Sequence, residues 1–239
     1  YYKTEMAREI MHIFGGPLPD WERWADAPAG LDELRASFDE ESGLGAALSA
    51  AGLDLAGVEA ELRATGALPP AVADALAPDV RHRLENALRA RWFVDVYKVE
   101  PDIALALNRK YGELDWRLPQ AHAIYWAEKG LDQADQRVHA NCERMIGHSL
   151  NQAFYEGRLL YVREGDEEYL DLAPNIGVLE STLNRHRENM DNHPDNMGFR
   201  AGYENFLIDA IVVLYTYGEE ERADELRREG RERFGDKFR

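Results

Sequence analysis

The sequence predicts an all-α protein in which helical hairpins stack as a short solenoid, preceded by a smaller helical N-terminal region. Ala, Leu, Glu and Arg are abundant, whereas Val, Ile and Thr, which favour strands, are sparse. Apolar residues recur at helical spacing, and strict alternation of apolar and polar residues is essentially absent. These two observations favour helices joined by short turns, with little or no sheet.

The N-terminal region, residues 1–77, begins with an amphipathic helix over residues 2–14, which the sequence GGPLPD ends. Short helices rich in Ala, Gly and Leu are expected from residue 31 to residue 76. Among them, Asp54 is the predicted N-cap of a helix that stops at Gly66.

Residues 78–239 form the predicted repeat domain, which begins with a long helix from Pro78 to about Glu100. A second helix starts at Pro101 and ends before Gly112, since Pro suits a first helical turn and Gly suits a C-terminal stop. A third helix is expected over residues 118–129.

The stretch YGELDWRLPQAHAIYWAEKG, residues 111–130, gathers two Trp, two Tyr and a His into twenty residues. We expect its Tyr and Trp side chains to pack between helical layers, with Tyr125 buried. Asp115 and Arg117 precede the helix and are expected to fix the turn before it. This interpretation is structural, and it assigns no catalytic role to His122.

Three similar blocks follow in order: YWAEKGLDQA from residue 125, YVREGDEEYL from residue 161 and LYTYGEEERA from residue 214. In each block a large residue is followed by a Gly and then by a small or apolar residue. This pattern is typical of a helical hairpin, in which Gly permits a tight turn and a small residue permits close helix packing. The predicted repeat positions are Tyr125, Gly130, Ala134, Tyr161, Gly165, Leu170, Leu214, Gly218 and Ala223.

These blocks resemble tetratricopeptide repeats (TPRs), whose helix-turn-helix unit recurs about every 34 residues. The resemblance covers residues 115–234 and departs from the family pattern, because the early Trp-Leu-Gly signature and the terminal Pro are missing. It implies stacked helix pairs and an extended surface that binds another protein or a peptide. On that basis the candidate partner-binding residues are His122, Trp126, Asn151, Tyr155, Arg158, Arg200, Tyr203 and Asn205.

The charge and cysteine content limit the classes of function. A net charge of −17 argues against nucleic acid as a partner, because phosphates need a basic surface. The single cysteine, Cys142, excludes an internal disulfide and a thiolate metal cluster. The chain begins with Tyr1 rather than Met, so the sequence allows a membrane anchor upstream of Tyr1. It does not decide between a cytoplasmic and a periplasmic location.

Among chemical sites, the segment HRENMDNHPDN carries His186, Asp191 and His193, which are possible metal ligands. Their spacing is poor for a metal and ordinary for a turn, so we expect no metal, no cofactor and no catalytic residue. The predicted function is a non-catalytic protein-interaction or scaffold module, either the soluble part of a membrane-anchored bacterial protein or a subunit of a complex. The alternative is an enzyme or a small-ligand or metal-binding protein with a pocket between helices.

Overall fold

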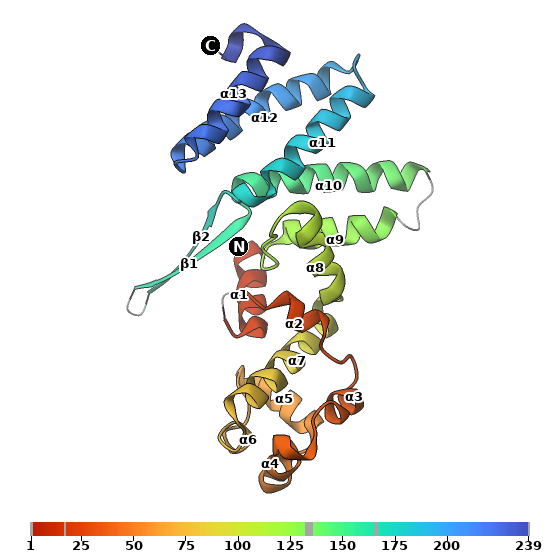
Figure 1. Cartoon of the computed structure of the whole chain (residues 1–239), viewed down its shortest axis with the longest axis vertical. Coiled ribbons are helices and arrows are strands. Elements are labelled where there is room, and N and C mark those ends of the chain that lie inside the picture. The colour runs from red at the N-terminus through yellow and green to blue at the C-terminus, as the bar shows by residue number, and fades with distance from the viewer. Residues whose placement is uncertain (1, 17, 132–135, 165–166, 239) are drawn as a thin grey trace. The chain divides into compact units, whose positions relative to one another are not determined.

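The computed structural model describes residues 2–16, 18–131, 136–164 and 167–238. The described residues form thirteen α-helices, three short 3₁₀ helices and one two-stranded sheet (Figure 1). The all-α prediction is therefore confirmed. The chain divides into two compact units, Tyr1–Asn108 and Arg109–Arg239, while the sequence-based boundary after residue 77 stays a prediction.

The described residues of the N-terminal unit form seven complete α-helices, a 3₁₀ helix and most of an eighth α-helix. Their bounds are α1 (Tyr2–Phe14), α2 (Trp21–Ala25), α3 (Leu31–Ala36), η1 (Glu40–Ser42), α4 (Leu44–Ala51), α5 (Leu55–Thr65), α6 (Pro70–Ala73), α7 (Pro78–Tyr97) and α8 (Pro101–Tyr111). The last of these, α8, crosses the division between the units.

One hydrophobic cluster of the N-terminal unit is mainly aliphatic, with Leu34, Val58 and Leu62 among its fully buried residues, and buried aromatic rings such as Trp24 and Phe93 pack together elsewhere in the unit. The predicted caps are confirmed: the Asp54 side chain accepts a hydrogen bond from the backbone of Gly57, and Gly66 ends α5 with a φ of 79°. Local signals in the sequence therefore set the ends of α5 as expected.

After the end of α8, the described residues of the C-terminal unit form five α-helices, two paired strands and two 3₁₀ helices. Their bounds are α9 (Pro119–Leu131), α10 (Gln136–Glu156), β1 (Arg158–Glu164), β2 (Glu167–Ala173), η2 (Ile176–Val178), α11 (Leu179–Asn192), α12 (Met197–Thr216), α13 (Glu220–Phe234) and η3 (Asp236–Phe238). Within this unit α9 packs on α10, α10 on α11, α11 on α12, and α12 on α13.

The third predicted repeat block has the expected form. Leu214 is fully buried in α12, Gly218 adopts a φ of 79° in the turn, and Ala223 is fully buried in α13. A left-handed residue in the turn and a small residue after it allow α12 and α13 to pack as a hairpin.

The first block belongs to a pair of helices, but its glycine does not form the turn between them. Tyr125 is fully buried in α9, as predicted, but Gly130 lies inside α9 rather than in the turn. A Cβ atom at Gly130 would lie 2.7 Å from the Cys142 sulfur, so this glycine permits close packing of α9 on α10. Ala134 lies outside the described residues.

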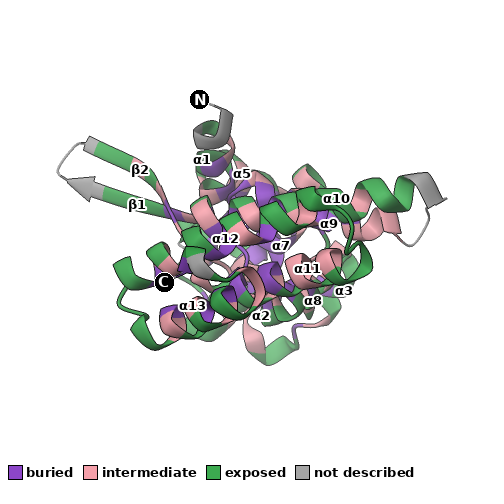
Figure 2. Ribbon diagram, turned by 90° about the horizontal axis from the view of Figure 1, so that it is seen from above, coloured by how far each residue is buried: buried purple, intermediate pink, exposed green. Residues whose placement is uncertain are grey.

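The prediction of a helical hairpin for the second block is wrong. The strands Arg158–Glu164 and Glu167–Ala173 pair in antiparallel fashion, with Tyr161 opposite Leu170, and Gly165 lies outside the described residues. The hairpin extends away from the helices of its unit and is mostly exposed (Figures 1 and 2). Leu160, Val162 and Tyr169, which lie on one of its faces, are each about half exposed.

A buried ion pair fastens the base of this hairpin. The Arg117 guanidinium donates two hydrogen bonds to the Asp115 carboxylate, at 2.8 and 2.7 Å, and a third to the Leu159 carbonyl at 2.9 Å. The Asp115 carboxylate in turn accepts from the Leu159 backbone N–H at 2.9 Å. Asp115 and Arg117 therefore fix more than the turn before α9, because they also hold the first residues of β1.

Candidate functional site

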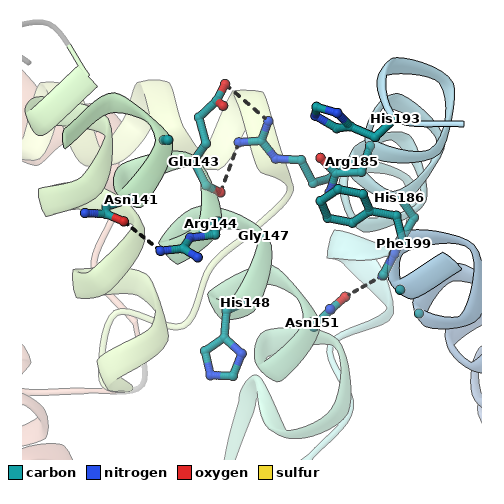
Figure 3. A pocket seen from close by; sticks show the side chains of 14 residues that line it. Asn141, Glu143, Arg144, Gly147, His148, Asn151, Arg185, His186, His193 and Phe199 are labelled. Atoms are coloured by element: carbon teal, nitrogen blue, oxygen red, sulfur yellow. Dashed lines mark hydrogen bonds and ion pairs between the residues drawn. The ribbon is translucent and has the colours of Figure 1, made fainter. Parts of the chain in front are cut away.

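A groove of about 670 Å³ opens between α10, α11 and α12 in the C-terminal unit (Figure 3). One wall is a single face of α10, formed by Asn141, Arg144, His148 and Asn151. These residues are spaced by three, four and three positions, so they follow one another along the helix. At 1.5 Å per residue, this wall is about 15 Å long.

The opposite wall comes from α11 and from the start of α12. Arg185 and His186 project from α11, and Phe199 and Gly202 from α12. The two helices are joined by a tight turn in which the Asn196 side chain accepts from the backbone N–H of Gly198. His193 stacks on Phe199 at this end, with ring centroids 5.3 Å apart.

His186 ties the walls of the groove together. Its Nε2 donates a hydrogen bond to the Asn151 Oδ1 at 2.9 Å, and its ring stacks on Phe206 and Tyr203 of α12. Burial lowers the pKa of the His186 imidazole to about 4, so this ring is neutral at pH 7. A neutral, hydrogen-bonded and stacked imidazole here joins α10, α11 and α12.

A polar network behind the groove holds α11 and α12 against α13. The Glu229 carboxylate accepts hydrogen bonds from Arg187 at 2.7 and 3.0 Å, from Arg233 at 3.0 Å and from the Tyr203 hydroxyl. Burial raises the pKa of Glu229, but the hydrogen bonds from Arg187 and Tyr203 outweigh it and lower the pKa to about 2. The walls on α11 and α12 are therefore held in place by a charged cluster.

The two arginines of the groove are held differently from Arg187. Arg144 donates to the neutral Asn141 Oδ1 at 2.7 Å. Arg185 reaches across to α10, where it donates to the Glu143 carbonyl at 3.4 Å and approaches the Glu143 and Glu188 carboxylates only to 3.9 and 3.8 Å (Figure 3). Among the described residues Arg144 has no carboxylate partner, whereas Arg185 forms two long ion pairs without a hydrogen bond to either carboxylate.

Two glycines in the middle of helices widen the groove. A Cβ atom at Gly202 would meet no atom within 4 Å, and one at Gly147 would make only an ordinary contact with Arg185 at 3.5 Å. Gly in a helix interior destabilises it by about 1 kcal/mol relative to Ala. Packing within the described chain thus gives no reason for glycine at these positions, whereas close approach of a bound molecule would.

The predicted partner-binding residues are distributed around this unit. Asn151 lines the groove, Asn205 is exposed on α12, and Trp126 is half exposed on α9. Tyr155 donates to Asp209 at 2.9 Å, and Arg158 donates to Glu113 at 3.3 Å.

Arg200 lies outside the groove. Its guanidinium sits 5.0 Å from the centroid of the Phe234 ring and donates to the Arg233 carbonyl at 3.2 Å.

For His122 and Tyr203 the expectation of a surface position is corrected. Tyr203 is fully buried beneath the groove, and His122 is 8 % exposed. The His122 Nε2 donates to the Trp116 carbonyl at 2.8 Å, which makes this imidazole part of the core around Trp116. Both residues stabilise helix packing and are covered by it.

The metal alternative gains no support from the geometry. No group of three or more His, Cys, Asp or Glu side chains with a metal-binding arrangement occurs among the described residues. His186 is committed to Asn151, His193 stacks on Phe199, and Asp191 is exposed.

Sequence reasoning missed Arg144, His148 and Arg185. The spacing of Asn141, Arg144, His148 and Asn151 is a signal that could have found the wall on α10, because it places four polar side chains on one helical face. The position of Arg185 opposite that face depends on packing between helices and leaves no such pattern.

Comparison with protein-family models, with curated proteins and with solved structures finds no match to this chain. Among the described helices, none is both long and apolar enough to cross a bilayer.

Proposed function

We propose that this chain is a non-catalytic protein-binding module, in which α9–α13 act as a short TPR-like array and the groove between α10, α11 and α12 holds an extended segment of a partner protein. The observation that carries this proposal is the groove itself, with its 15 Å wall and its two glycines that leave space for another backbone. A wall of about 15 Å matches an extended segment of four to five residues, at about 3.3 Å per residue.

The lining chemistry supports recognition of a peptide. Amide, imidazole and guanidinium groups from Asn141, Asn189, His148 and Arg144 offer hydrogen bonds to a backbone or to polar side chains. The sequential packing of α9 to α13 also supports the proposal, since stacked helices of this kind present extended surfaces to partners.

The test is selection of binding peptides from a random displayed library with the full chain, followed by fluorescence anisotropy on the selected peptides. Gly202→Leu places a side chain in the open space of the groove and is expected to weaken binding at least about tenfold, which corresponds to 1.4 kcal/mol. Ala201→Leu is the matched control, because Ala201 is exposed on the same helix and does not line the groove. Equal affinity of both variants for the selected peptides would show that the groove is not the binding site.

A second candidate function is a small-molecule site in the same groove. Its volume lies within the range of about 300 to 1,000 Å³ that is usual for such sites. Native mass spectrometry of the chain purified from its own host separates the two functions. A stoichiometric small molecule that is lost in Gly202→Leu would favour this second function over peptide binding.

A further inference from the structure

We infer that the segment held in the groove is acidic and that Arg144 and Arg185 bind its side-chain carboxylates; this rests on the proposed peptide-binding function. The first observation is the charge of the groove lining. The chain has 45 acidic against 28 basic residues, whereas the lining has two arginines and one acidic residue, Glu143, and the Glu188 carboxylate lies 3.8 Å from Arg185. An acidic partner would be repelled by most of this chain, and the exposed Arg144 gives the groove a positive group that attracts it.

The state of Arg144 is the second observation. Its side chain is exposed, and its recorded partner among the described residues is the amide oxygen of Asn141. An amide holds the guanidinium in position without neutralising its charge. By contrast, the Arg187, Arg117 and Arg63 guanidiniums each lie within 2.7 Å of a carboxylate oxygen. Arg144 is thus pre-positioned while its charge is available to a ligand.

Arg185 supplies the second positive charge from the opposite wall. Its guanidinium crosses to α10 and lies beside Glu143, the residue next to Arg144 in the sequence (Figure 3). Its distances to carboxylates, 3.8 and 3.9 Å, are too long for hydrogen bonds. A carboxylate of the ligand can therefore form closer, bidentate hydrogen bonds than those that Arg185 makes in the free chain.

Side-chain carboxylates are favoured over a lone terminal carboxylate because the donors are spread along the wall. His148 and Asn151 continue the same face of α10 beyond Arg144, for about 10 Å from Arg144 to Asn151. An extended acidic segment can use this length, with one carboxylate at Arg144, another at Arg185 and its backbone along the remaining donors.

The test uses three fluorescent peptides of about ten residues that span the wall. They share one sequence in which the central positions are Glu, Gln or Lys, and all three have blocked ends. Anisotropy with the full chain is expected to show binding of the Glu peptide, at least about tenfold weaker binding of the Gln peptide and no binding of the Lys peptide. The affinity of the Glu peptide should also fall as salt is raised.

The variant that tests the assignment is Arg144→Gln combined with Arg185→Gln, which should weaken binding of the Glu peptide at least about tenfold. The matched control is Arg227→Gln combined with Arg228→Gln on α13, which changes the net charge equally away from the groove. Its affinity should stay within about twofold of that of the unaltered chain. Thermal unfolding of both variants verifies that they are folded.

Three outcomes would overturn the inference. Equal loss of binding in the two double variants would show a general charge effect. Failure of the end-blocked Glu peptide to bind, when a fourth peptide of the same sequence with a free C-terminus does bind, would show that a terminal carboxylate is recognised. Neutral or basic peptides from the library that lose affinity in Gly202→Leu would leave the groove as a peptide site while refuting its acidic ligand, so the two proposals fail separately.

Discussion

At the scale of single residues, the Asp115–Arg117 pair shows how a short sequence motif acts at a distance. The Asp115 side chain is fully buried, and the Arg117 side chain is 9 % exposed. Two buried charges are tolerated because each also satisfies a backbone group of Leu159, one the N–H and the other the carbonyl. The pair thus orders the start of β1 as well as its own turn.

We predict that Asp115→Asn lowers the free energy of unfolding of the C-terminal unit by about 3 kcal/mol, because it leaves the Arg117 guanidinium buried without a counter-charge. Denaturant unfolding measures this loss. Hydrogen exchange of the Leu159 amide should also become faster, since that N–H donates to the Asp115 carboxylate.

The matched control is Glu113→Gln, which removes the charge of the exposed partner of Arg158 at the base of the same hairpin. An exposed ion pair contributes less than about 1 kcal/mol, so this variant should unfold almost as the unaltered chain does. Similar losses in the two variants would contradict a special role for the buried pair.

At the scale of elements, the contacts of Glu229 couple α11, α12 and α13. Burial raises the pKa of the Tyr203 hydroxyl, as does its hydrogen bond to Glu229. The pKa of Glu229 is lowered to about 2 from an ordinary value of 4.5. A carboxyl group whose pKa is lower in the folded state stabilises the fold above its unfolded pKa, and this stabilisation is lost as pH falls toward the folded value.

We therefore predict a pH-dependent difference between the unaltered chain and Glu229→Gln. At neutral pH the variant should be less stable by roughly 1–2 kcal/mol, a value that allows for partial solvent screening of this cluster. The difference should shrink as pH falls from 4.5 toward 2. Urea unfolding of both proteins across this pH range measures it, and a difference that does not change with pH would contradict the assigned role of the carboxylate.

The same scale shows what the sequence could and could not predict. The turn between α12 and α13 was predictable because Leu214, Gly218 and Ala223 carry its local requirements: a buried apolar residue, a left-handed turn and a small contact. The strand β1 was not predictable from its block, because Asp115, 44 residues earlier, holds its first backbone groups. Contacts of this range leave no periodic signal in one sequence.

The groove also has one wall that the sequence could predict locally and another whose position depends on packing between helices. The polar face of α10 can be inferred from the spacing of the polar residues between Asn141 and Asn151. That Arg185 faces it, and that Gly202 leaves space beside it, depend on how α11 and α12 pack through His186. The candidate surface inferred from repeat positions therefore included Asn151 but missed both arginines.

At the scale of the whole molecule, the chain has two sets of buried residues that belong to separate units. The N-terminal unit has its own buried residues, among which Leu62 is fully buried in an aliphatic cluster. The C-terminal unit has a core that includes Leu183 of α11, also fully buried. Because each unit buries its own apolar residues, each is expected to unfold as a separate cooperative unit.

We predict that Leu62→Ala destabilises the N-terminal unit by about 2 to 5 kcal/mol and leaves amide protection of α12 unchanged, because the cavity it creates lies in a separate core. Leu183→Ala should do the reverse, with loss of protection in α11 and α12 and none in α5. Hydrogen exchange of the full chain measures both effects in one experiment. Equal loss of protection in both units after either substitution would show that the chain unfolds as one unit, and binding in the groove would then depend on the integrity of residues 1–108.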